Sequence, residues 1–165
     1  MISMKEILGN TPLLWATKKG NEEVVKILLA QEEVDPNRPN HRGQTPLSFA
    51  IWHECEEVVK MLLRREEVNP DKPDGHGITP LLYAASEGHE GIVKILLARE
   101  EVDPDKPDND GTTPLLCATL EGHEGIVRIL LAREEVDPDK PDGDGTAPLL
   151  CAVSEGHEGD RKSVV

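Results

Sequence analysis

The chain has 165 residues, of which 2% are aromatic and 30% are charged, and its formal net charge is −14. So few aromatic side chains disfavour a single large closed core, whereas a thin core of aliphatic residues stays possible. The acidic balance excludes ligands that require a face of Lys and Arg, such as nucleic acid and anionic membrane surfaces, and it favours basic or neutral protein partners.

Two observations bear on the compartment. The first ten residues contain one lysine and no apolar run of signal-peptide length, and no later run is long enough to span a membrane. Cys55, Cys117 and Cys151 form no CxxC pair and cannot all pair within one chain. Together these features predict an intracellular protein, cytoplasmic or nuclear, in a reducing environment.

A Thr/Ala-Pro-Leu tripeptide begins at residues 11, 45, 79, 113 and 147, each time 34 residues after the previous copy. A fixed period of this length predicts a stack in which each unit buries its apolar face on its neighbours. The predicted organisation is an N-terminal cap segment at 1–10, full units at 11–44, 45–78, 79–112 and 113–146, and a partial fifth unit at 147–165.

Local signals in the third unit predict two short helices. Thr79 suits an N-cap, and Pro80 suits the first helical position, where its missing N–H has no helical partner. The first helix should end at Gly88, because glycine adopts the left-handed conformation without a side-chain clash. A second helix is expected from Glu90 to about Arg99, with its apolar residues on one face.

The segment after the second helix should project as a finger. In the third unit Pro104, Pro107 and Gly111 disfavour helix and favour an extended turn. The finger is acidic, and its acids are either a contact strip for a basic partner or a solvated edge that keeps the array soluble: Asp103, Asp105, Asp108 and Asp110. A calcium loop is disfavoured because the two prolines break the EF-hand spacing.

The residues that the units share carry a resemblance to a known family. The pattern TPLLxAxxxGHE, with Ala at one register in every copy, resembles the ankyrin repeat from Gly9 to about Gly159. The resemblance implies an all-α solenoid of stacked helix-turn-helix units with hairpin-like fingers. It also implies a non-enzymatic protein-interaction module without a cofactor. The 34-residue period and the REEVDPDKPD finger are similar to those of ankyrin arrays in large fungal proteins.

The positions at which the units carry different residues are candidates for a function specific to this chain. Trp15, Phe49 and Tyr83 occupy one register of the first helix, and Trp52 follows Phe49 by three residues on the same face. In the resembling family this face lines the concave groove that holds partner segments. The implied partner-binding residues are Trp15, Lys18, Lys19, Phe49, Trp52, His53, Tyr83, Ser86, Glu87, Leu120 and Glu121, with Cys117, Cys151, Ser154 and Glu155 at matching positions.

This strip changes from basic and aromatic to small and acidic along the array, which would orient a bound segment. A partner with a basic or apolar extended segment is therefore expected, and five units span roughly 40 Å, enough for about 12 extended residues. The alternative is that the rings only fill gaps between neighbouring helices. Trp52 is harder to assign to packing, because its counterparts are mostly polar.

The Gly-His steps give two further expectations. His89, His123 and His157 recur in one context, which predicts a repeated cap geometry at the start of the second helix and disfavours a metal site. In the second unit the step becomes Glu54-Cys55, which places a non-glycine residue in a left-handed position at a cost of roughly 1 kcal/mol.

The ends of the array depart from the pattern. After His157 the expected outer-helix residues are replaced by DRKSVV. Either this tail is an improvised polar cap, or the chain is a fragment or truncated copy of a longer array. At the N-terminus, Met1, Ile2, Met4, Ile7 and Leu8 form either an apolar lid or a frayed segment.

These features leave three alternative functions. The first is a protein-binding module that uses the inner-helix groove, and the second is a structural spacer or self-associating array. The third is an enzyme, which is disfavoured because no nucleophile elbow, phosphate loop or sheltered cluster of convergent polar groups appears. The sequence predicts a monomer, with end-to-end association as the alternative.

Overall fold

A computed structural model of the chain describes residues 10–148. Within this range the helices are α2 (Pro12–Lys18), α3 (Glu22–Leu29), α4 (Pro46–Trp52), α5 (Glu56–Leu62), α6 (Pro80–Ser86), α7 (Glu90–Leu97), α8 (Pro114–Leu120) and α9 (Glu124–Leu131), and residues 10–148 contain no strand. The expected all-α stack of helix pairs is confirmed. Expectations about residues 1–9 and 149–165, including the N-terminal lid, Cys151, Ser154, Glu155, His157 and the tail, lie outside the described residues.

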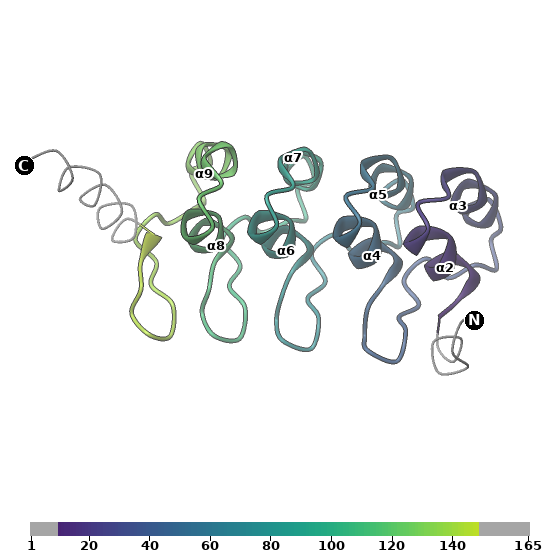
Figure 1. Cartoon of the computed structure of the whole chain (residues 1–165), viewed down its shortest axis with the longest axis horizontal. Helices are drawn as coiled ribbons and strands as arrows, with labels where there is room; N and C mark the ends of the chain where they lie inside the picture. Colours follow the sequence, from purple (N-terminus) through teal and green to yellow (C-terminus); the bar gives the residue numbers. More distant parts are fainter. Residues whose placement is uncertain (1–9, 149–165) are drawn as a thin grey trace, which may run out of the picture.

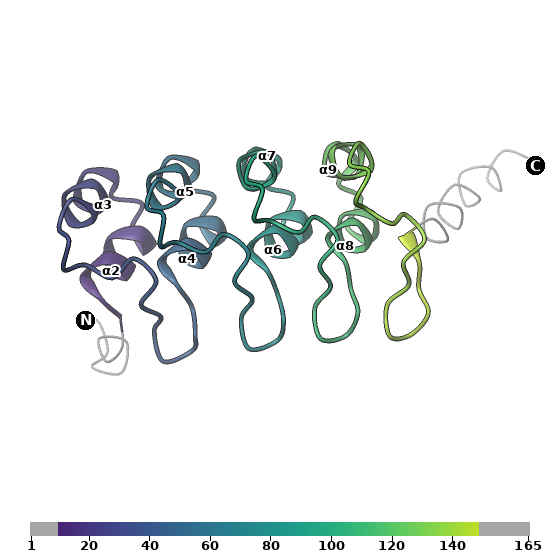
Figure 2. The ribbon, with the colours of Figure 1, turned by 180° about the vertical axis from the view of Figure 1, so that it is seen from behind.

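The helices form two parallel rows. The inner row contains α2, α4, α6 and α8, the outer row contains α3, α5, α7 and α9, and each helix contacts the next one in its row. Figures 1 and 2 show the inner row lying between the outer row and four long loops. We call these loops finger 1 (35–44), finger 2 (69–78), finger 3 (103–112) and finger 4 (137–146). The inner helices are therefore bordered by fingers on one side only.

Each inner helix begins as the sequence predicts. The hydroxyl of Thr79 accepts a hydrogen bond from the backbone N–H of Leu82 at 3.1 Å, Pro80 opens the helix, and the other units repeat this arrangement at Thr11, Thr45 and Thr113. The helix ends at Ser86, and Gly88 follows with φ +79°. The Thr-Pro and Gly signals thus fix both ends of the inner helix.

The outer helix of the third unit ends slightly earlier than predicted. In the third unit the helix ends at Leu97 and not near Arg99, whose backbone N–H bonds to the Leu96 carbonyl in a tighter turn. This early end lets the chain reverse and return Val102, 6% exposed, to the core. Burial of one apolar side chain therefore decides where the helix ends.

His89 and His123 stand at the predicted cap positions, without a capping hydrogen bond from the side chain. His89 and His123 are the N-cap residues of α7 and α9, and neither side chain makes a capping hydrogen bond. The His123 Nε2 atom instead lies 3.0 Å from the Ser86 carbonyl oxygen of the preceding unit. The repeated cap position is therefore confirmed at His89 and His123, while the His123 side chain contacts the preceding unit.

The core is a continuous ribbon along the array. It is built mainly from the Leu of each Thr-Pro-Leu step and from Val, Ile and Leu on the outer helices. Its most buried members include Leu13, Leu47, Leu81, Leu115, Val59, Leu62, Ile92, Leu96, Ile126 and Leu130. Because each unit contributes only a thin layer, the chain folds with almost no aromatic residues in its core.

Acidic and amide side chains close the finger turns. In finger 3, the Asp108 Oδ1 atom accepts the backbone N–H groups of Asp110 (3.0 Å) and Thr112 (2.9 Å). The same pair of bonds is made by Asn40, Asp74 and Asp142 in the other fingers. Much of the finger acidity thus holds the turn in shape, a role beyond the contact strip and the solvated edge.

Glu54 occupies the position where the other units have glycine, and its φ is +53°. We expect Glu54→Gly to raise the free energy of unfolding by about 1 kcal/mol, because glycine removes the left-handed penalty of an L-residue. Urea denaturation followed by circular dichroism measures the change. Glu54→Gln is the matched control, since it keeps the backbone penalty and removes only the charge. A lower stability of the Glu54→Gly variant would contradict the prediction.

Candidate functional site

The first unit presents a tryptophan with a cation above it. Trp15 on α2 is partly exposed, and the Lys18 Nζ atom lies 5.5 Å from the centroid of its ring. Lys19, at the C-cap of the same helix, is exposed. This end of the inner row is therefore positively charged, as the sequence predicts, and Trp15 lies apart from the other rings.

The remaining aromatic residues gather at the second and third units. Trp52 is 52% exposed, whereas Phe49, one turn earlier, is only 8% exposed. The Trp52 ring stacks near Phe49 (centroids 6.4 Å apart) and His53 (6.5 Å), and it approaches the partly buried Tyr83 of the next unit at 6.1 Å. Phe49 thus supports the cluster from below, and Trp52 offers its surface to solvent.

Toward the fourth unit, the side chains at the remaining predicted positions are smaller or acidic. The Ser86 hydroxyl donates to the Tyr83 carbonyl at 2.9 Å, while Glu87, Leu120 and Glu121 are exposed. Leu120 is 50% exposed, unlike the other leucines of α8. These side chains are accessible to a partner but belong to no cluster.

Cys117 occupies the aromatic register in the fourth unit. Burial raises the pKa of its thiol to about 11, and the nearby Asp108 and Glu121 carboxylates contribute to the increase. The thiol is therefore protonated at neutral pH and behaves as a small apolar group. Burial also raises the pKa of Tyr83, with a contribution from Glu87.

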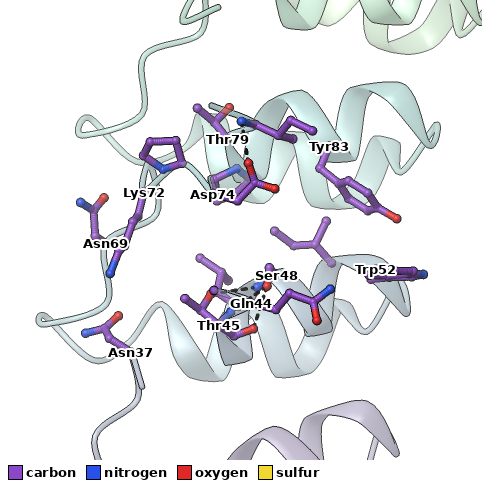
Figure 3. A pocket seen from close by; sticks show the side chains of 16 residues that line it. Asn37, Gln44, Thr45, Ser48, Trp52, Asn69, Lys72, Asp74, Thr79 and Tyr83 are labelled. Atoms are coloured by element: carbon purple, nitrogen blue, oxygen red, sulfur yellow. Dashed lines mark hydrogen bonds between the residues drawn. The ribbon is translucent and has the colours of Figure 1, made fainter. Parts of the chain in front are cut away.

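A pocket of about 110 Å³ lies between α4 and α6 and between fingers 1 and 2 (Figure 3). Trp52 and Tyr83 stand at one end of it, and Asn37, Asn69 and Lys72 lie at the other. The space between is lined mainly by apolar side chains and by the turn residues of both fingers: Gly43, Gln44, Thr45, Leu47, Ser48, Ile51, Pro73, Asp74, Ile78, Thr79 and Pro80. We call this space the seam pocket.

The positions of the aromatic strip do not predict the seam pocket. A signal was present at one other position. Ser48 stands where the other units have Leu14, Leu82 and Leu116, all of them buried. A small polar residue in place of a buried leucine indicates space that the fold itself does not fill.

Among residues 10–148 no group of three or more His, Cys, Asp or Glu side chains is arranged to hold a metal ion. The same residues include no helix long and apolar enough to cross a membrane.

A family model described as ankyrin repeats (3 copies) matches residues 2–74 and 66–142. The chain therefore belongs to the ankyrin repeat family. Ankyrin repeats are generally protein–protein interaction modules and typically non-enzymatic. None of the curated proteins compared with the chain is similar enough to count as a match.

Proposed function

We propose that the chain is a non-enzymatic binding module that holds an extended segment of a partner protein along its inner helices, beside the fingers. The observation that carries this proposal is Trp52. It is a large ring, 52% exposed, on a helix whose other apolar residues are buried. Large apolar residues exposed at the centre of a surface are typical anchors for protein partners.

The contacts around Trp52 support an anchor that is already positioned. Phe49 and His53 stack near its ring, and Tyr83 approaches from the neighbouring helix. An aromatic side chain held in this way loses little freedom on binding, so more of its contact energy appears as affinity. An exposed ring without such neighbours would be a weaker candidate.

Charge supports an orientation for the segment. The inner row has Lys18 and Lys19 at the first unit and Glu87 and Glu121 at the third and fourth. The fingers follow the same order, since finger 1 contains two arginines and one aspartate, while fingers 3 and 4 each contain one lysine and four aspartates. A segment with acids at one end and bases at the other would meet complementary charge at both ends.

The free thiols of Cys55 and Cys117 support an intracellular, reducing location for this interaction. Catalysis has no place in the proposal. In the seam pocket, Asp74 accepts a turn-closing hydrogen bond, and the hydroxyls of Thr45, Ser48 and Thr79 are engaged in hydrogen bonds at the helix starts.

The test is selection of random 12-residue displayed peptides on the purified chain, followed by fluorescence anisotropy with individual synthetic peptides. We expect Trp52→Ala to weaken binding by about 2 kcal/mol, or roughly 30-fold, because the anchor surface is lost. Ile27→Ala is the matched control: Ile27 is 61% exposed on α3 of the outer row, and its removal should leave affinity unchanged within twofold.

Two results would overturn the proposal. One is failure to enrich any peptide, and the other is enrichment of peptides that bind the Trp52→Ala variant as tightly as the native chain. Concentration-dependent mass in sedimentation velocity, independent of Trp52, would instead favour a self-associating array.

A further inference from the structure

Neighbouring fingers are joined by lysines along most of the array. The Lys106 Nζ atom of finger 3 bonds to the Asp71 carboxylate of finger 2 at 2.6 Å, and Lys140 of finger 4 bonds to Asp105 of finger 3 at 2.8 Å. Each lysine also donates to the backbone carbonyl of the same aspartate. Both carboxylates are largely buried, so these are strong, charge-assisted links.

The link is missing between fingers 1 and 2. Lys72 is the equivalent lysine, but the residue it would meet is Asn37 in place of an aspartate. Asn37 instead donates its side-chain amide to the Glu67 carbonyl. Lys72 is exposed and has no hydrogen-bond or ionic partner among residues 10–148, which leaves an unpaired cation at the rim of the seam pocket.

The backbone link between these fingers is missing too. Asn109 N–H bonds to the His76 carbonyl at 3.1 Å, and Gly143 N–H bonds to the Asp110 carbonyl at 2.7 Å, joining fingers 2, 3 and 4. The corresponding pair in fingers 1 and 2 is Gly75 and Arg42, and no hydrogen bond joins them in the described structure. Fingers 1 and 2 therefore lack both of the links that join the other neighbouring fingers. We call this place the open seam.

A smaller side chain also leaves space inside the open seam. Ser48 replaces a buried leucine at the pocket wall, and its hydroxyl turns back to the helix start, donating to the Thr45 carbonyl (2.8 Å) and accepting from the Thr45 N–H (2.9 Å). The hydroxyl is thus satisfied locally, and the volume of the missing leucine is left to the pocket. The unpaired Lys72, the small Ser48 and the exposed Trp52 are separate departures from the repeat that meet in one place.

We infer that the seam pocket seats one apolar side chain of the partner segment, and that Lys72 pairs with a carboxylate of an adjacent Asp or Glu in that segment. This inference rests on the proposed function and specifies its central contact. The volume of about 110 Å³ suits a single side chain, since it is below the roughly 300 Å³ at which pockets for drug-sized ligands begin. The apolar walls suit an aliphatic or aromatic group, and the unpaired lysine selects the carboxylate.

The test restores the repeat pattern one residue at a time and uses the selected 12-residue peptides as probes. In the series Ser48→Ala, Ser48→Val, Ser48→Leu, affinity should fall progressively, by at least tenfold at leucine, as the side chain fills the pocket. The leucine variant should fold, because the other inner helices carry leucine there; an unchanged or raised melting temperature verifies this.

A second variant tests the cation. Asn37→Asp supplies the missing partner of Lys72 and should weaken binding about fivefold, and the loss should vanish for peptides whose acidic residue is changed to its amide. Asn109→Asp adds the same charge to finger 3 and serves as the control.

The outcomes separate the two proposals. Peptides that lose affinity with Trp52→Ala but bind all Ser48 variants equally would leave the proposed function standing and overturn the pocket assignment. Self-association that disappears with Ser48→Leu would identify a second copy of the chain as the occupant, which also overturns it. If no peptide is enriched, both proposals fail together.

Discussion

Replacing Leu81 with alanine is expected to lower the free energy of unfolding by about 2 to 5 kcal/mol. Leu81 lies on α6 in the middle of the array, is 0% exposed, and belongs to the continuous core cluster. Its removal loses the burial of the side chain and leaves a cavity between units that have little other core to relax into. Because each unit is stable only against its neighbours, the adjacent units should unfold with it.

Urea denaturation with two probes measures this effect. Far-UV circular dichroism reports all the helices, and tryptophan fluorescence reports the first two units through Trp15 and Trp52. The matched control is Leu120→Ala on α8, where a 50% exposed leucine should change stability by less than about 0.5 kcal/mol. A change at Leu81 as small as this control would show that the inner helices do not stack in the described register.

Gly111→Ala is expected to cost about 2 to 4 kcal/mol. Gly111 has φ +86°, and a Cβ atom there would lie 2.9 Å from the Gly143 backbone nitrogen of finger 4. The left-handed conformation alone costs an alanine roughly 1 to 2 kcal/mol, and the backbone contact adds an overpacking cost of similar size. Fingers 3 and 4 would have to separate, which breaks the Gly143 N–H to Asp110 carbonyl bond.

Gly43→Ala separates the two contributions. Gly43 occupies the same place in finger 1 with φ +76°, but a Cβ atom there meets nothing within 4 Å. Its substitution should cost only the conformational part, about 1 to 2 kcal/mol. Equal losses at Gly43 and Gly111, measured by urea denaturation, would contradict the close packing of fingers 3 and 4 and the openness of the seam between fingers 1 and 2.

The sequence predicted the elements wherever a local signal decides the structure. Thr79 and Pro80 fix the helix start, because a hydroxyl cap and a missing N–H act within one turn. The left-handed Glu54 was likewise predicted from a single missing glycine. The helix end near Arg99 was wrong, because the burial of Val102 in the core decides where α7 ends.

The candidate site likewise has features that the sequence predicts and features that depend on contacts between units. The position of Phe49 and Trp52 on one helix follows from their spacing, but their opposite burial does not, since that depends on what the neighbouring unit and the fingers cover. Phe49 therefore packs between the units, whereas Trp52 has the exposed surface that the binding interpretation requires.

The sequence by itself determined the repeat, the helix pairs, the family and the charge order along the array, because each of these depends on periodicity or on signals within one unit. Only the tertiary structure decided which side chains are exposed and that Ser48, Trp52 and Lys72 border one open seam. The pocket at this seam is completed by Asn37 of the first unit and Tyr83 of the third, so it depends on contacts between units that no single repeat encodes.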